Sequence, residues 1–155
     1  LLAPALGGQG AGWAMALATA CAMAGRALAG WLLRPGMSRR RIFAANAVVQ
    51  AGGVALLATT GAPALLLLAT AIFGFGIGNA TTLPPLIAQQ DFRESDVGRV
   101  VALLVASGQA TYAFAPAAFG LLRELDAMAL FAGVIVCEVV AAFVMLARPR
   151  TARPG

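Results

Sequence analysis

The sequence has no histidine and only two cysteines, and these shortages exclude several kinds of chemistry. Without histidine the chain lacks the commonest general base and metal ligand, so a serine–histidine catalytic pair is impossible. Cys21 and Cys137 lie in apolar runs without a CxxC or other metal-like spacing, so we expect inert packing residues. We therefore expect no enzyme, no metal site and no cofactor.

Charged residues are also scarce, at 11% of the 155 residues, whereas hydrophobic residues make up 61%. A soluble domain has about a quarter of its residues charged, so this chain cannot cover a water-exposed surface. In lipid every backbone polar group must be satisfied internally, which leaves helices or closed barrels. Alanine and leucine dominate and period-2 alternation is absent, so the sequence predicts an all-α membrane protein.

Five apolar runs are long enough to cross a bilayer, whose hydrocarbon core of about 30 Å needs about 20 helical residues. The runs cover residues 11–33, 42–60, 63–87, 99–122 and 127–147. We expect a polytopic transmembrane helix bundle of five spans in residues 1–147. Residues 148–155 are expected to form a basic cytoplasmic tail.

The arginines gather in every second break between the runs. Nine of the eleven are Arg34, Arg39, Arg40, Arg41, Arg93, Arg99, Arg148, Arg150 and Arg153. Because arginine-rich breaks face the cytoplasm, we expect the N-terminus outside and the C-terminus in the cytoplasm of a cell with a plasma (inner) membrane. This placement of the net charge of +5 favours the lipid bilayer, and not nucleic acid, as the partner.

The few polar side chains inside the runs are the candidate functional residues, because such groups mark solute pathways or interhelical contacts. The candidate solute contacts are Arg26, Asn79, Thr81, Thr82, Gln109, Thr111 and Tyr112. The structural alternatives are snorkelling of Arg26 to the interface and interhelical hydrogen bonds for the others. Asn46 and Gln50 share a helix face and are expected to be packing groups.

Glu138 is a carboxyl near the middle of the last apolar run. Burial favours the neutral form of a carboxyl, so Glu138 is a candidate for proton coupling. The alternative is a structural role, either as a neutral buried acid or as the partner of another side chain.

Glycines mark the third run. Gly74 and Gly78 form a small-xxx-small pair, with Gly76 between them, and this spacing predicts close helix packing. Pro84 and Pro85 follow, so we expect the helix to be weakened here. Weakened helices in membrane proteins occur where the backbone lines a cavity or is buried in protein.

The stretch from Gly25 to Arg41 resembles the arginine-rich cytoplasmic loop of major facilitator superfamily transporters. The residues that carry this loop motif are Gly30, Arg34, Arg39, Arg40 and Arg41. Arg34 stands where the family has an aspartate, while Met37 and Ser38 replace a glycine and a basic residue. Such departures resemble the degenerate copy between helices eight and nine of the family.

The resemblance implies a chain that holds helices eight to twelve, the C-terminal half of a transporter. A first residue that is not methionine also leads us to expect a fragment. The implied function is secondary active transport of a small solute by alternating access, open to proton coupling, with a missing N-terminal half as the other cavity wall. The alternative function is a non-transport membrane anchor or assembly subunit.

Overall fold

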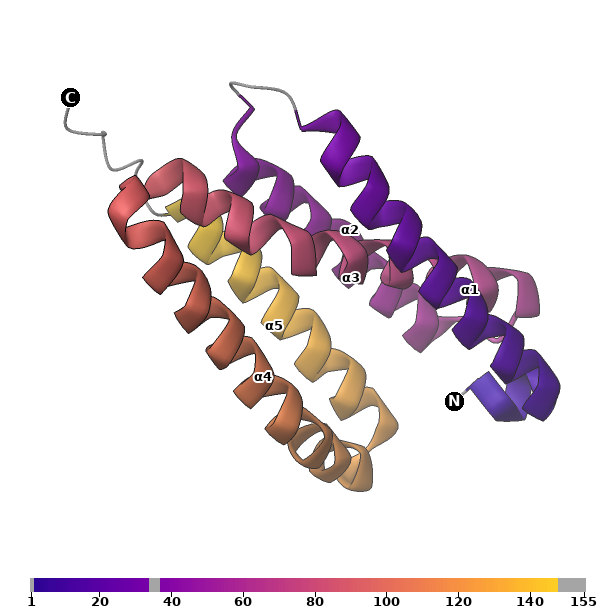
Figure 1. Ribbon diagram of the computed structural model, residues 1–155. Coiled ribbons are helices and arrows are strands. Elements are labelled where there is room, and N and C mark those ends of the chain that lie inside the picture. The colour runs from indigo at the N-terminus through magenta and orange to yellow at the C-terminus, as the bar shows by residue number, and fades with distance from the viewer. Residues whose placement is uncertain (1, 34–36, 148–155) are drawn as a thin grey trace.

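The computed structural model describes residues 2–33 and 37–147 and is built of helices (Figure 1). The helices are α1 (Leu2–Leu32), α2 (Arg39–Thr59), α3 (Pro63–Asp91), α4 (Glu94–Leu125) and α5 (Ala127–Ala147). No strand occurs in either described range, so the prediction of an all-α protein is confirmed. The expected loop residue Arg34 and the expected tail 148–155 lie outside the described residues.

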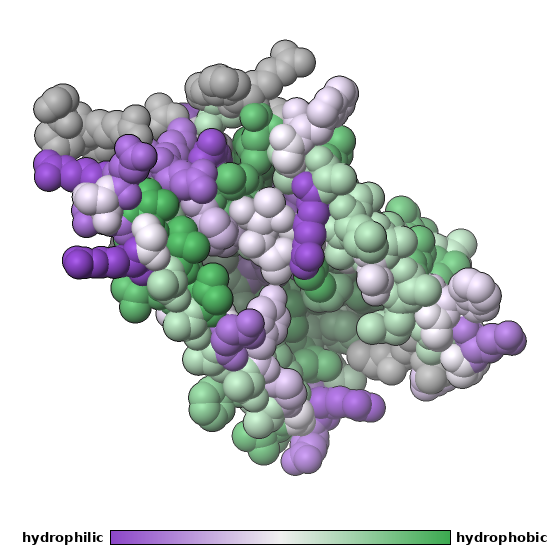
Figure 2. Space-filling model, viewed as in Figure 1, coloured by the Kyte–Doolittle hydropathy of each residue, from purple (hydrophilic) through white to green (hydrophobic). Residues whose placement is uncertain are grey.

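Four helices, α2 to α5, are long and apolar enough to cross a membrane, as expected for a multi-pass membrane protein. Figure 2 shows hydrophobic residues along the helices and hydrophilic residues gathered mostly toward the end where α3 meets α4. Among the described residues α1 is not one of these four, although its 31 residues give it sufficient length. Its glycines, together with Gln9 and Arg26, lower the hydropathy of α1.

Helices α1 and α4 begin well before the apolar runs that predicted them. The fourth run starts at residue 99, whereas α4 already starts at Glu94. Glu94 and Asp96 lie in its first turn, where carboxylates interact favourably with the helix dipole. The first helix starts at Leu2 and bends at Gly7, whose φ of 73° lies in the left-handed region that favours glycine.

The central element is α3, which packs against α1, α2 and α4. The last helix, α5, packs against α2 and α4, whereas α1 packs along α3 alone. Figure 1 shows the α4–α5 hairpin set apart from α1, with α2 and α3 between them. Among the described residues α1 and α4 therefore do not pack against each other.

The seam between α1 and α3 is built of small residues. Ala14 is fully buried, and a Cβ added at Gly74 or Gly78 would overlap the backbone of Ala18 or Ala22. Glycine is thus required at both positions for the two backbones to approach this closely. The small-xxx-small pair of α3 contacts a matching series of alanines on α1.

The expected weakening at Pro84 and Pro85 does not interrupt the helix, since α3 runs through both prolines to Asp91. Prolines remove two backbone N–H donors, but packing holds the helix on both sides of them. Leu83 and Ile87 are buried next to the prolines. Tertiary packing therefore outweighs the local cost of the two prolines.

Candidate functional site

A groove of about 250 Å³ lies between α3 and α4 and brings three of the predicted polar residues together. Its lining includes Thr81, Pro84, Leu104, Gly108, Gln109 and Tyr112. Thr81 comes from α3, whereas Gln109 and Tyr112 come from α4. The two proline rings noted in the sequence thus form part of the α3 wall, since Pro85 also lines the groove.

The polar groups of this groove are uncharged and accessible. Gln109 and Thr81 are exposed, and the Tyr112 side chain is 64% exposed. The Thr81 hydroxyl donates to the carbonyl oxygens of Ile77 and Gly78 on its own helix, at 3.2 and 3.0 Å. The Thr81 oxygen can still accept a hydrogen bond, and the Gln109 amide and the Tyr112 phenol can each donate or accept one. The groove can therefore hydrogen-bond a neutral polar group.

Asn79 does not line this groove; it takes part in a polar cluster between α2 and α3. Its Nδ2 donates to Oδ1 of Asn46 at 3.1 Å, and Asn46 Nδ2 donates to the carbonyl oxygen of Gly76 at 3.0 Å. Gln50 accepts a longer bond from Asn46, at 3.4 Å, and is 3% exposed. A Cβ at Gly76 would lie 2.6 Å from Gln50 Oε1. The geometry of Asn79 is that of an interhelical hydrogen bond.

Two other candidates bond within their own helices. The Thr82 hydroxyl donates to the Gly78 carbonyl at 2.9 Å. The Thr111 hydroxyl donates to the Ser107 carbonyl, also at 2.9 Å. Such bonds to the preceding turn satisfy a hydroxyl in an apolar setting without a solute. Neither residue lines the groove that contains Thr81.

The two charged candidates lie on different sides of the bundle. Arg26 is exposed on α1, directly after Gly25, which is buried against α3. Glu138 is half-buried on α5, one turn before Ala142. Ala142 packs against α2, so Glu138 lies on the face of α5 that looks into the bundle. The structure does not bring these two charged residues into one ion pair among the described residues.

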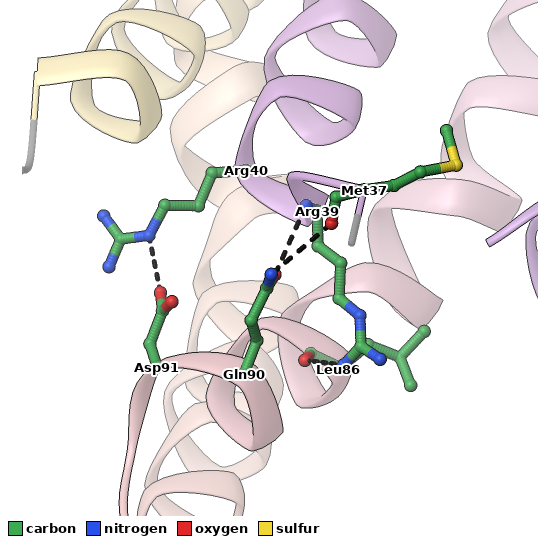
Figure 3. A network of polar contacts seen from close by, with 6 residues as sticks. All are labelled: Met37, Arg39, Arg40, Leu86, Gln90 and Asp91. Carbon is green, nitrogen blue, oxygen red and sulfur yellow. Dashed lines mark hydrogen bonds and ion pairs between the residues drawn. The ribbon is translucent and has the colours of Figure 1, made fainter. Parts of the chain in front are cut away.

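An ion pair joins the start of α2 to the end of α3, where the predicted loop motif lies (Figure 3). Arg40 Nε lies 2.5 Å from Asp91 Oδ2, with side-chain exposures of 17% and 11%. Three acids close together in the sequence are the suggested partners for the basic cluster: Asp91, Glu94 and Asp96. Asp91 is the one that is paired, since the other two point outward from the first turn of α4 and are exposed.

Further hydrogen bonds extend this contact (Figure 3). Arg39 donates through Nη1 to the Leu86 carbonyl, and its backbone N–H donates to Gln90 Oε1 at 3.4 Å. Gln90 Nε2 in turn donates to the Met37 carbonyl at 3.4 Å. Sequence reasoning did not find Gln90; its only signal was its position next to Asp91.

The remaining motif residues lie outside this network. Gly30 is exposed near the end of α1, with nothing within 4 Å of an added Cβ, and Arg41 is exposed on the first turn of α2. Arg39 and Arg40, which precede Arg41, are partly buried in the contact with α3. The basic cluster therefore divides into two residues that bind α3 and one that faces outward.

Comparison with protein families, with curated proteins and with solved structures finds no match to this chain. What the chain does is therefore inferred from its own residues. The candidates for a functional role are the groove residues of α3 and α4, Arg26 of α1, and the Arg40–Asp91 contact.

Proposed function

We propose that the chain carries out secondary active transport of a small solute by alternating access, as part of a longer transporter of the major facilitator type. The groove between α3 and α4 is the observation that carries this proposal. Thr81, Gln109 and Tyr112 present uncharged hydrogen-bonding groups there, beside helix-breaking residues, as in solute sites of transporters. No covalent chemistry is required of them.

The proposal includes α1 as a fifth membrane span. Trp13 and Trp31 are 18 residues apart, five whole turns, so they share one face about 27 Å apart by helical rise. They are 71% and 82% exposed. Tryptophan prefers the two membrane–water interfaces, and this spacing is close to a hydrocarbon thickness of about 30 Å. The pair can anchor α1 at both interfaces of one bilayer.

Five spans with arginine on every second connection give one orientation, with the N-terminus outside and the C-terminus cytoplasmic. The Arg40–Asp91 contact then lies on the cytoplasmic side of a plasma (inner) membrane. Alternating access requires helix ends on one side to separate while those on the other side close. A partly exposed ion pair is weak enough to break during such a cycle. In this proposal Arg40 and Asp91 favour the cytoplasm-closed state.

Glu138 is the candidate proton carrier of this proposal, because it is a carboxyl that faces into the bundle within a membrane span. A solute would bind in the groove between α3 and α4, which lies on other helices. Coupling would therefore pass through helix packing, and not through direct contact between proton site and solute.

Cysteine labelling tests the groove. In a chain with both native cysteines replaced by alanine, single cysteines at Gln109 and Tyr112 should react with a membrane-impermeant thiol reagent in sealed vesicles. A cysteine at Leu103 provides the matched control, since it is 68% exposed on an apolar part of the same helix. It should face lipid and stay unreactive. Asn79→Cys should react more slowly than the groove cysteines, because residue 79 is partly buried and lies outside the groove.

The alternative function, a non-transport membrane anchor or assembly subunit, predicts a different result. Its helices would face lipid or protein everywhere, with no shared water-filled cavity. Cysteines at Gln109 and Tyr112 would then react no faster than the cysteine at Leu103. That outcome would overturn the transport proposal in favour of the anchor.

A further inference from the structure

A second and larger cavity, of about 570 Å³, lies at the end of the bundle opposite to the Arg40–Asp91 pair. It is formed by α1, the end of α2 and the starts of α3 and α5. Its apolar lining includes Met15, Leu57, Leu66, Met128 and Phe131. The volume is in the range of small-molecule pockets, and methionines adapt to irregular apolar ligands. The cavity therefore suits an apolar body better than a polar one.

Arg26 lies on the same face of α1 as Met15. The two residues are 11 apart, close to three whole turns, which places Arg26 about 16 Å further along the helix. Arg26 is the only charged residue in the sequence of α1, and it is exposed. Among the described residues it takes part in no ion pair. One face of α1 thus carries both Met15, which lines the apolar cavity, and Arg26, which has no ion-pair partner among the described residues.

In the described helices α1 itself has no acidic residue. The acids of α3 and α4 lie near their ends: Asp91, Glu94, Asp96 and Glu124. The remaining acid of a helix is Glu138, on α5, which does not pack against α1. Arg26 would therefore attract an anionic ligand on this face, and no acid of α1 would repel it. A cationic ligand would be repelled by Arg26.

We propose that Arg26 and the apolar cavity together bind a single-chain amphipathic carboxylate. The chain occupies the cavity beside Met15, and the carboxylate accepts charge-assisted hydrogen bonds from the Arg26 guanidinium. An alkyl chain gains little by leaving lipid for an apolar cavity, so the charged head determines which ligand binds. Binding at this site does not depend on the proposed function. Only the identification of this ligand class with the transported solute rests on it.

Photolabelling tests the site with the full chain in nanodiscs of zwitterionic lipid. The probe is dodecanoate with a terminal diazirine, and mass spectrometry locates the labelled residues. We expect label on cavity residues such as Met15, Met128 and Phe131. Excess dodecanoate should remove it, while dodecylamine and acetate should not. Arg26→Gln should lower cavity labelling at least fivefold, and Arg26→Lys should retain more of it.

Arg123→Gln is the matched control, because Arg123 is an exposed arginine in the last turn of α4. Its labelling should equal that of the unchanged chain. Thermal unfolding of each variant checks that the bundle is intact, and Arg26→Met, which also removes the charge, carries the test if Arg26→Gln does not fold. Equal labelling with and without the charge at residue 26, or equal competition by dodecylamine, would overturn the inference and leave an ordinary lipid contact.

Transport is measured separately, as uptake of radiolabelled dodecanoate into vesicles that contain the complete transporter. Arg26-dependent labelling together with Arg26-dependent uptake supports both proposals. Arg26-dependent labelling without uptake of any solute class supports the site and overturns the proposed function. Uptake of other solutes without Arg26-dependent labelling overturns the site and leaves the proposed function standing.

Discussion

Replacing Gly25 with alanine is expected to push α1 away from α3. The new Cβ would lie 2.5 Å from the Phe75 carbonyl oxygen, about 0.9 Å closer than the 3.4 Å at which contact becomes ordinary. The obstacle is backbone, so no side-chain rotation relieves it. Overpacking of a close contact costs about 1–3 kcal/mol. Alanine also favours helix over glycine by about 1 kcal/mol, and this gain must be separated from the clash.

Gly30→Ala separates the two effects. Gly30 lies five residues further along the same helix, and nothing lies within 4 Å of an added Cβ. Both variants gain helix propensity, and Gly25→Ala gains at least as much because Gly30 lies in the last turn, so a lower unfolding temperature of Gly25→Ala reports the clash. With about 2–4 °C per kcal/mol for a chain of this size, Gly25→Ala should unfold about 2–12 °C below Gly30→Ala.

The assay is thermal unfolding in one detergent, followed by circular dichroism and by tryptophan fluorescence from Trp13 and Trp31. Gly78→Ala, on the opposite side of the seam, should behave like Gly25→Ala because its Cβ would overlap the backbone of Ala22. Equal unfolding temperatures for Gly25→Ala and Gly30→Ala would refute the close α1–α3 seam.

Two further predictions concern charged residues. A double-mutant cycle with Arg40→Gln and Asp91→Asn should give a coupling energy of about 1 kcal/mol in unfolding, because the pair is partly buried and 2.5 Å apart. The same cycle with Arg41, which is exposed, and Asp91 should give a value near zero; equal values would mean that the close pair adds nothing. Glu138→Gln should flatten the pH dependence of transport in the complete transporter, since glutamine cannot carry a proton. An unchanged pH profile would exclude Glu138 from coupling.

Composition and run length predicted the helices well because membrane helices must satisfy their backbone internally and must match the bilayer thickness. The expected runs 42–60 and 127–147 differ little from α2 and α5. The start of α4 was missed because charged residues near Glu94 suggested a loop. A polar loop and a first helical turn with acidic residues have similarly low hydropathy, so hydropathy alone cannot distinguish them.

The site was harder to predict than the helices, because what each polar side chain contacts depends on which helices pack side by side. Thr81 and Asn79 are two residues apart, yet one lines the groove and the other bonds to α2. Their spacing places them on different faces of α3, and only the packed bundle shows what each face meets. Asp91 was one of three suggested partners for the arginines, and the meeting of α2 and α3 selects it.

The α1–α3 seam also bears on how the chain is made. The residues of α1 that enter the seam are synthesised before α2 and before the glycines of α3. About 50 residues separate the two halves of the seam, which at about 5–20 residues per second takes several seconds. Throughout that time α1 lacks its α3 partner, and the alanine face that later packs on α3 is left without it. Substitutions at Gly74 or Gly78 should therefore appear as slow or incomplete membrane assembly, even where the finished bundle tolerates them.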